Sequence, residues 1–359
     1  MTASNQPHGS SDDRGGRPTK GQPRATILWL NFNSMKNISL IFRSLDSLLE
    51  QEYQDFEILI IDNASDDGSW DAVKQHLGPG PGAGPPLRFL ETERNLGYTG
   101  GFDYGYRHRD PSSRYVAVIS DDAILSRDFL AALVGAMEKD PSIGAAQGIV
   151  TTMDGSRVDS AGVLVDRFMI PHHVMRGEAV RSQGEPMVVS FVEGTCPVYR
   201  VEALRKVMGS HLFYPEGFFQ YLEDNLNGLL LWTSGYRCLT LPRVVARHKR
   251  EAGGGGLLRT YCLWRNRTAL VRITDSRYKL LEYVFAFSSM VYLLASGQEG
   301  KARVLVKGAY DGHGLAGRLR KRGFRISLAK VPMYRLGPEY MALLVSKSRG
   351  RGRLDEMDL

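Results

Sequence analysis

The sequence predicts an α/β fold built on a mostly parallel, doubly wound sheet with helices at the C-terminal end. Apolar strand-like runs and helical segments alternate four times between residues 25 and 139, which is the pattern of a parallel sheet with crossover helices. Two of the apolar runs end on acidic residues, at Asp62 and at Asp121-Asp122. Open α/β sheets bind ligands at the carboxyl ends of their strands, so these acids also predict where a site lies.

The individual elements follow in order from residue 25. In the first half we expect strands at 25–30, 56–61, 88–90 and 115–119, and helices at 34–49, 66–76, 97–107 and 126–139. The Gly- and Pro-rich residues 78–86 predict a loop. Later segments predict strands at 144–152, 158–165, 187–192, 236–241 and 244–246, with a helix at 223–234. From the glycines at 253–256 the pattern is helical to about residue 320.

Composition limits the class of protein and its surroundings. The chain has 359 residues. We expect a disordered tail at 1–23, one domain at 24–250 and a helical region at 251–359. A net charge of +7 suits an anionic ligand or an acidic membrane surface, and we expect no nucleic-acid partner. Three scattered cysteines have neither a metal-type spacing nor a disulfide framework. With no apolar signal segment and no spanning-length apolar run, the sequence predicts a cytoplasmic protein.

The acidic strand end at Asp121-Asp122 carries the strongest chemical signal. Adjacent carboxylates repel each other, and a hard divalent cation such as Mg²⁺ or Mn²⁺ offsets that repulsion. A metal here commonly carries a diphosphate. The alternative is that both acids cap the helix that follows.

Two further segments suit a nucleotide. Asp62, at the end of the second strand, is placed to accept hydrogen bonds from ribose hydroxyls or a base N–H, although a turn and helix cap explain it equally. The first strand ends at Asn31-Phe32-Asn33 without a Gly-rich phosphate loop. Residues 95–101 contain three glycines, which indicate either close approach of a ligand or tight helix packing.

Two segments of the second half suit catalysis. Glu223-Asp224 stands at a predicted helix start after an aromatic run. A general base in an aromatic pocket and a charged first turn are both consistent with this position. His248 lies in a cationic run after an apolar strand, where its imidazole could complete a metal site or simply be solvated.

Taken in order, these segments resemble the family 2 inverting glycosyltransferases of GT-A fold, in particular their rhamnosyltransferase-like branch. The resemblance covers about residues 25–270 and runs through 26–33, 61–65, 95–101, the Asp121-Asp122 strand end, Val192–Thr195, Glu223-Asp224, 235–237, His248 and 261–266. It implies a nucleotide-diphosphate-sugar donor, either dTDP-rhamnose or a UDP-sugar, and a glycan or lipid-linked acceptor for polysaccharide or cell-envelope synthesis.

The resemblance also implies residue roles. Asp224, with Glu223, would supply the catalytic base, and Asp122 and His248 would hold Mg²⁺ or Mn²⁺. Donor binding would fall to Asn31, Asn33, Asp62, Asn95, Gly97, Gly101, Ser120 and Asp121. Acceptor binding would fall to Glu193, Gly194, Thr195 and Tyr221.

Two positions depart from the family pattern. Ser120 replaces the first acidic or Asn residue of the metal motif, and Leu226 replaces an acid two residues after the Glu-Asp pair. These departures keep a catalytically inactive glycan-binding protein as an alternative. A sugar-1-phosphate nucleotidyltransferase is a further alternative, but it requires a Gly-rich loop after the first strand, where this chain has Asn31-Phe32-Asn33-Ser34.

The C-terminal helical region has a distinctive charge pattern. Residues 280–294 are mostly apolar or aromatic, and residues 301–325 carry eight basic side chains and one acid, Asp311. An apolar helix followed by a basic one predicts attachment to an anionic membrane surface, here the inner face of the cell membrane. A core helix or a homodimer contact is the alternative.

Overall fold

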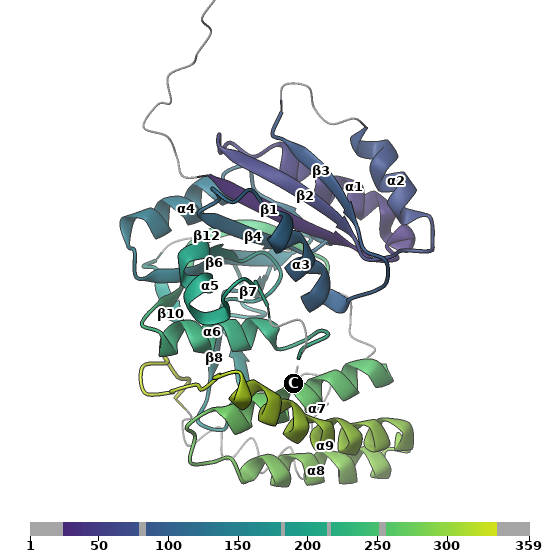
Figure 1. The fold of residues 1–359 in the computed structure, drawn as a ribbon, viewed down its shortest axis with the longest axis vertical. Coiled ribbons are helices and arrows are strands. Elements are labelled where there is room, and N and C mark those ends of the chain that lie inside the picture. Colours follow the sequence, from purple (N-terminus) through teal and green to yellow (C-terminus); the bar gives the residue numbers. More distant parts are fainter. Residues whose placement is uncertain (1–23, 79–83, 181–183, 214–216, 251–255, 336–359) are drawn as a thin grey trace, which may run out of the picture.

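A curled mixed sheet forms the centre of the molecule, with three helices at its lower end (Figure 1). The computed structural model describes residues 24–78, 84–180, 184–213, 217–250 and 256–335. The predicted tail at 1–23 and most of the loop at 78–86 lie outside these residues, as do three of the four glycines at 253–256. The main path of the sheet runs β10-β12-β6-β11-β4-β1-β2-β3, with β5 paired to β12 and β7 to β6.

The first half of the chain builds the parallel part of the sheet. Its strands are β1 (Ala25–Asn31), β2 (Phe56–Asp62), β3 (Leu87–Glu91) and β4 (Tyr115–Ile119). β4, β1, β2 and β3 lie side by side in that order and are all parallel. Asn31 is in register with Asp62, so polar side chains end both central strands at the same edge. The predicted strand-and-helix alternation is therefore confirmed in this half.

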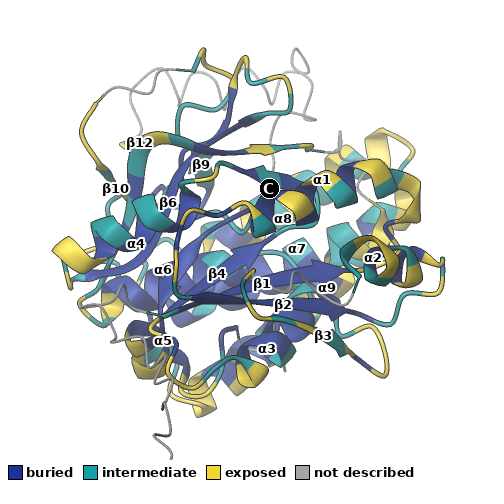
Figure 2. Ribbon diagram, turned by 90° about the horizontal axis from the view of Figure 1, so that it is seen from above, coloured by how far each residue is buried: buried dark blue, intermediate teal, exposed yellow. Residues whose placement is uncertain are grey.

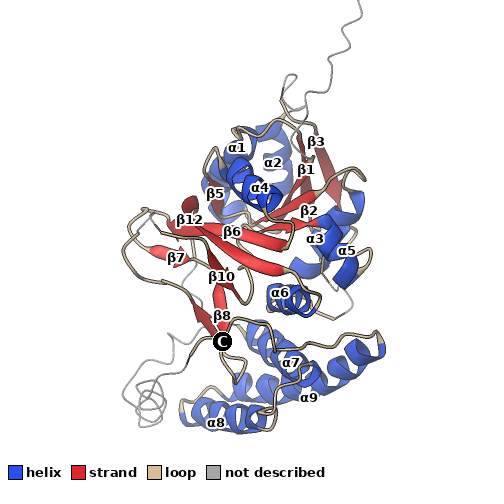
Figure 3. Cartoon of the chain, turned by 90° about the vertical axis from the view of Figure 1, so that its left-hand side faces the viewer, coloured by secondary structure: helices blue, strands red, loops and turns tan. Residues whose placement is uncertain are grey.

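Helices cover both faces of the sheet (Figure 3). On one face lie α1 (Ile38–Leu49), α2 (Ser69–Leu77) and α4 (Phe129–Lys139), and on the other α3 (Gly97–His108), α5 (Val201–Met208) and α6 (Glu223–Thr233). β1 shows why both faces are covered. Ile27 and Trp29 pack on the face that α1, α2 and α4 cover. The alternating residues Leu28 and Leu30 pack on the face that α3, α5 and α6 cover. Figure 2 shows that the central strands are buried throughout.

The second half adds further strands, and β5, β7, β10 and β11 run antiparallel to their neighbours, which makes the sheet mixed. They are β5 (Ala123–Leu125), β6 (Ile143–Thr152), β7 (Val158–Ser160), β10 (Met187–Val189), β11 (Val198–Arg200) and β12 (Arg237–His248), with a separate hairpin of β8 (Val163–Val165) and β9 (Pro171–His173). β11 lies between β4 and β6 and is antiparallel to both. β12 is one strand where two were predicted, with a register shift between Thr240 and Val244.

The three C-terminal helices pack on the sheet domain through a shared core. They are α7 (Leu257–Ile273), α8 (Leu281–Ala295) and α9 (Glu299–Lys321). Ala269 and Leu270 of α7 and Leu315 of α9 join the same buried cluster as α6. α9 approaches α7 so closely that a Cβ on Gly312 would lie 2.5 Å from the Arg265 carbonyl oxygen. The helical C-terminal part is thus confirmed. The predicted boundary between the domain at 24–250 and the helical region at 251–359 stays a prediction.

Charged groups also hold these helices in place. Glu282 of α8 is buried and accepts a 3.0 Å hydrogen bond from Arg267 of α7, which also donates to the Met169 carbonyl.

Among the helices that the structure describes, none combines the length and apolarity needed to cross a bilayer.

Candidate active site

A cleft of about 1050 Å³ opens at the carboxyl ends of β1 and β4, beside α6 and the end of β12. Eleven of the sixteen predicted site residues line it: Asn33, Ser120, Asp121, Asp122, Glu193, Gly194, Thr195, Tyr221, Glu223, Asp224 and His248. Residues separated by more than 200 positions in sequence therefore meet at one site. The other five, Asn31, Asp62, Asn95, Gly97 and Gly101, lie outside its lining.

Asp62 is buried and already engaged by its neighbours. Its carboxylate accepts hydrogen bonds from Asn31 Nδ2 at 2.8 Å and from the backbone N–H and hydroxyl of Ser65 at 2.9 and 2.7 Å. These contacts fix the loop between β2 and α2 against the end of β1. Asn33, in the left-handed region at φ 48°, exchanges hydrogen bonds with Asp66 across the same two loops. The geometry thus supports a structural role for Asp62, and its contact with a nucleoside stays a prediction.

The predicted Gly-rich segment forms the start of α3. Gly97 has φ 72°, and a Cβ there would lie 2.3 Å from the Phe219 carbonyl oxygen. A Cβ on Gly101 would lie 2.6 Å from Leu30 Cδ1. Asn63 Nδ2 donates to Asn95 Oδ1 at 3.0 Å. Tight packing accounts for both glycines, and donor contacts at Asn95, Gly97 and Gly101 remain predictions.

Asp122 and His248 form the candidate metal site. His248 is in register with Ala123 because β12 pairs with β5, which brings His248 Nε2 within 3.2 Å of Asp122 Oδ1. On its other side His248 Nδ1 lies 2.7 Å from Asp159 Oδ2. Burial by itself lowers the pKa of His248, but the hydrogen bonds with Asp122 and Asp159 outweigh it and raise that pKa to about 9. Burial and the Asp122 carboxylate raise the pKa of Asp121 to about 7.

These donors fit a divalent cation that is shared with a substrate. One carboxylate and one imidazole are ligands that Mn²⁺ accepts, and carboxylate oxygens also suit Mg²⁺. Within the described part of the chain, no three His, Cys, Asp or Glu side chains converge on one metal position. A cation here would complete its coordination with water and with oxygens of a bound anion. Ser120 contributes no carboxylate, which agrees with a site of few protein ligands.

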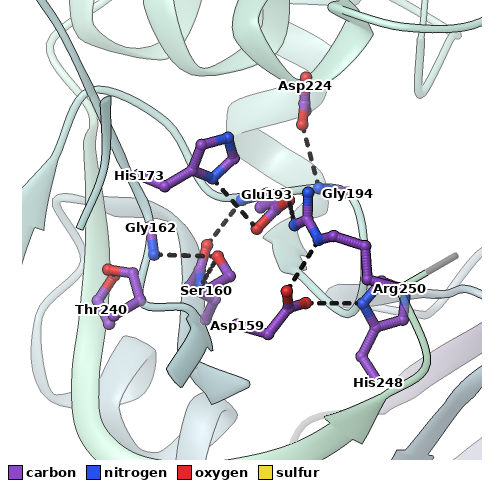
Figure 4. A network of polar contacts seen from close by, with 12 residues as sticks. Asp159, Ser160, Gly162, His173, Glu193, Gly194, Asp224, Thr240, His248 and Arg250 are labelled. Carbon is purple, nitrogen blue, oxygen red and sulfur yellow. Dashed lines mark hydrogen bonds and ion pairs between the residues drawn. The ribbon is translucent and has the colours of Figure 1, made fainter. Parts of the chain in front are cut away.

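A network of polar contacts connects the metal pair to the opposite wall of the cleft (Figure 4). Arg250 donates to Asp159 at 2.8 Å and to Glu193 at 2.6 Å. His173 Nδ1 lies 3.7 Å from Glu193 Oε2. Burial by itself raises the pKa of Glu193, but His173 and Arg250 hold it well below its usual range. Glu193 is therefore a permanent anion between the metal pair and Asp224.

Asp224 is placed as a base at the start of α6. Its Oδ2 accepts a 3.1 Å hydrogen bond from the Gly194 backbone N–H, and Tyr98 donates to the Gly194 carbonyl at 2.6 Å. Burial and the nearby Glu193 anion raise the pKa of Asp224 to about 6, although N–H groups of Asn225 and Gly194 partly oppose this. A carboxylate with such a pKa is ionised at neutral pH and still accepts a proton readily.

Glu223, the preceding residue, has a different environment. It is buried, and its Oε2 has no hydrogen-bond partner among the residues described. Burial and the Asp224 charge raise the pKa of Glu223 well above its ordinary value. The ionised form of Glu223 is therefore disfavoured, and Asp224 is the member of the pair whose carboxylate is oriented by the Gly194 N–H. Leu226, where the family pattern has an acid, is fully buried in the hydrophobic core and does not reach the cleft.

The turn before this pair has an unusual backbone and is held from α7. Tyr221 and Leu222 have φ of 69° and 67°, a left-handed conformation that costs side-chain-bearing residues of order 1–3 kcal/mol each. Asn266 of α7 is fully buried, and its Nδ2 donates to the Gln220 and Tyr221 carbonyls at 2.9 and 2.8 Å. Asn266 thus fixes the strained turn that aims Asp224 into the cleft.

Sequence reasoning missed some of these residues. Asp159 and His173 carry no motif and reach the site only through β7 and β9. In the sequence, Arg250 stood out only as part of a cationic run. Asn266 belonged to the segment 261–266 that resembles the family, but no role was predicted for it.

Comparison with known proteins assigns the fold and the enzyme class. Residues 30–208 match the family model described as Glycosyl transferase family 2. The chain carries a glycosyl transferase family 2 domain and is a glycosyltransferase. No curated protein sequence matches it significantly.

Two solved glycosyltransferase structures share the fold. A mannosyltransferase from Pyrobaculum calidifontis, PcManGT, in complex with GDP-Man and Mn²⁺, is 17% identical with a TM-score of 0.52, over 93% of this chain and 82% of that one. GalNAc-T7, with UDP, GalNAc and Mn²⁺, is 13% identical with a TM-score of 0.57, over 86% of this chain and 59% of that one. The fold of this glycosyltransferase is therefore the GT-A fold that the sequence predicted.

Proposed function

We propose that this glycosyltransferase is a metal-dependent, inverting enzyme that transfers a sugar from a nucleotide-diphosphate donor to an acceptor hydroxyl. The observation that carries the proposal is Asp224, a partly buried carboxylate whose pKa is raised to about 6, in the same cleft as the Asp122–His248 pair. A base for the acceptor hydroxyl and a cation site for the leaving diphosphate are two groups that such a direct transfer can use. Mn²⁺ in both similar structures supports use of a divalent cation.

In this mechanism the Asp224 carboxylate removes the proton from the acceptor hydroxyl. The acceptor oxygen forms a bond to the anomeric carbon while the bond from that carbon to the diphosphate oxygen breaks. Attack from the face opposite the leaving group inverts the anomeric configuration. Glu193 raises the basicity of Asp224 through its negative charge, and the Gly194 N–H orients the Asp224 carboxylate.

The leaving diphosphate needs positive charge on the other side of the cleft. Asp122 and His248 would hold Mg²⁺ or Mn²⁺, which stabilises the negative charge that develops on the leaving diphosphate. Asp159 accepts a hydrogen bond from Nδ1, the other ring nitrogen of His248, and so fixes the direction of the imidazole. Lys249, which lines the same cleft, adds a cation at this end.

The donor and acceptor are proposed at the level of class. The resemblance to the rhamnosyltransferase-like branch supports dTDP-rhamnose or a UDP-sugar, and GDP-Man in a similar structure adds GDP-mannose to the donors worth testing. The aromatic Tyr221 and the segment Glu193, Gly194 and Thr195 form the acceptor wall of the cleft. We propose a glycan or lipid-linked acceptor at the cytoplasmic face of the cell membrane, in polysaccharide or cell-envelope synthesis.

A thermal-shift panel of nucleotide sugars, with and without Mn²⁺, tests this function. The correct donor should raise the melting temperature more in the presence of Mn²⁺, since a ligand that binds only the folded state stabilises it. Asp122→Ala should remove the Mn²⁺-dependent part of the shift, while the surface variant Asp71→Ala, a matched control, should keep it. If no nucleotide sugar raises the melting temperature with any divalent cation, the proposed function is wrong.

A further inference from the structure

The outer side of α8 exposes apolar side chains and no charge. Its exposed large hydrophobic residues, which we call the α8 face, are Leu280, just before the helix, and Tyr283, Val284, Phe287, Val291, Tyr292 and Leu294. Leu280 is 72% exposed and Phe287 is 64% exposed. Glu282 is the only charged residue of α8, and it is buried against Arg267. Contiguous apolar surface of this kind marks a contact with another molecule or a membrane.

Positive charge is concentrated in the segment of the chain that contains α8 and α9. Residues 277–335 contain twelve Lys and Arg residues against three acids, whereas the whole chain has a net charge of only +7. The positive excess of the protein therefore lies in this part, and the remainder is slightly acidic. All three acids are paired, Glu282 with Arg267, Asp311 with Lys307 and Glu299 with Arg303. Arg303 of α9, which packs along α8, is 82% exposed.

This combination selects among the partners that could cover the α8 face. A second copy would bring two strongly positive segments together, and their repulsion opposes a symmetric pairing through α8. Nucleic acid requires cations at the contact itself, and the α8 face carries none. An anionic lipid surface satisfies both features, because its acyl region takes the apolar side chains and its headgroups attract the surrounding cations.

We infer that the α8 face docks on an anionic membrane surface, with α8 lying in the plane of the interface. Tyr283 and Tyr292 have the amphipathic character that suits headgroup depth. α8 has 15 residues, fewer than the roughly 20 that a spanning helix needs, so we place it on the membrane surface and not across the bilayer. The proposed function enters this inference only as the biological reason for the docking, which would bring the cleft close to a lipid-linked acceptor.

Vesicle flotation of the full chain tests the inference without any enzyme assay. The chain should float with vesicles of phosphatidylcholine mixed with phosphatidylglycerol, and far less with phosphatidylcholine alone or at high salt. The double variant Phe287→Ser with Val291→Ser should lower the vesicle partition coefficient roughly tenfold or more, since it removes two buried apolar side chains from the contact. Val188→Ser on β10, an exposed apolar residue away from α8, is the matched control and should float as the wild type does.

Two results would overturn the inference. One is equal flotation of the double variant and the wild type, with melting temperatures showing that both are folded. The other is a wild-type chain that does not bind vesicles but sediments as a dimer, which the double variant converts to a monomer. The face would then be an interface between copies. Donor binding in the thermal-shift panel is independent of both outcomes, so failure here leaves the proposed function standing.

Discussion

Asn266 links the C-terminal helices to the catalytic turn, and its replacement by leucine should separate folding from catalysis. Asn266→Leu keeps the side-chain volume but removes both N–H donors to the Gln220 and Tyr221 carbonyls. A carbonyl left without a donor in a buried site costs about 1–3 kcal/mol, so loss of both donors should cost about 2–6 kcal/mol of stability. At roughly 2 °C per kcal/mol for a chain of this size, the melting temperature of the variant should fall by roughly 4–12 °C.

The effect on catalysis should be larger than this loss of stability explains. Without Asn266 the left-handed residues Tyr221 and Leu222 can relax toward ordinary backbone conformations, which moves Asp224. Displacement of a catalytic group by about 1 Å typically costs about 10²-fold in rate. We expect kcat to fall by about that factor well below the melting temperature, with the KM for the donor nearly unchanged, because the donor side of the cleft does not contact this turn.

Thr268→Val provides the matched control. Thr268 lies in the same helix, is equally buried and donates at 3.3 Å to Glu282, but it does not touch the catalytic turn. It should lose some stability and keep its kcat. The assay is steady-state transfer or donor hydrolysis, with circular dichroism melting on the same samples. If the two variants had the same kcat, Asn266 would be a structural residue only and the reasoning above would be refuted.

Three further predictions concern the charged groups of the cleft. First, kcat/KM should fall as the pH drops below about 6, because Asp224 must be ionised to act as a base; a rate that stays flat to pH 5 would contradict this. Second, Asp224→Asn should raise the melting temperature at pH 8. The pKa of Asp224 rises from 3.8 to about 6 on folding, so its ionised form destabilises the fold above pH 6, and the advantage of the variant should shrink as the pH falls from 6 to 4. Third, Asp159→Asn should raise the Mn²⁺ concentration needed for the half-maximal rate about 10- to 100-fold, because Asp159 orients His248. If that concentration were unchanged, His248 would not be a metal ligand.

Sequence reasoning was most successful where apolar runs are long. β1, β2 and β4 are largely apolar strands, and acids stand at or just beyond the ends of β2 and β4, so both the parallel sheet and the edge that carries the site could be predicted. The strands β5, β9 and β11 have three residues each, too few for any period to show. β5 matters for function, because its pairing with β12 is what brings His248 beside Asp122.

The parts of the site that escaped prediction depend on tertiary contacts. Arg250 reaches Asp159 and Glu193 across separations of 91 and 57 residues, and Asn266 reaches Tyr221 across 45. No local pattern records such pairings. The same limit applies to Asp62, whose position at a strand end suggested a nucleoside contact although Asn31 and Ser65 already occupy its carboxylate.

Sugar transfer by the Asp224→Asn variant tests the central claim most directly. Wild-type protein and variant are given Mn²⁺ and the nucleotide sugar identified by thermal shift, and release of the nucleoside diphosphate is followed over time. The account predicts turnover by the wild type and loss of turnover in the variant, which should still show the donor-induced thermal shift. Transfer at the wild-type rate by Asp224→Asn would show that Asp224 is not the base and would contradict the mechanism.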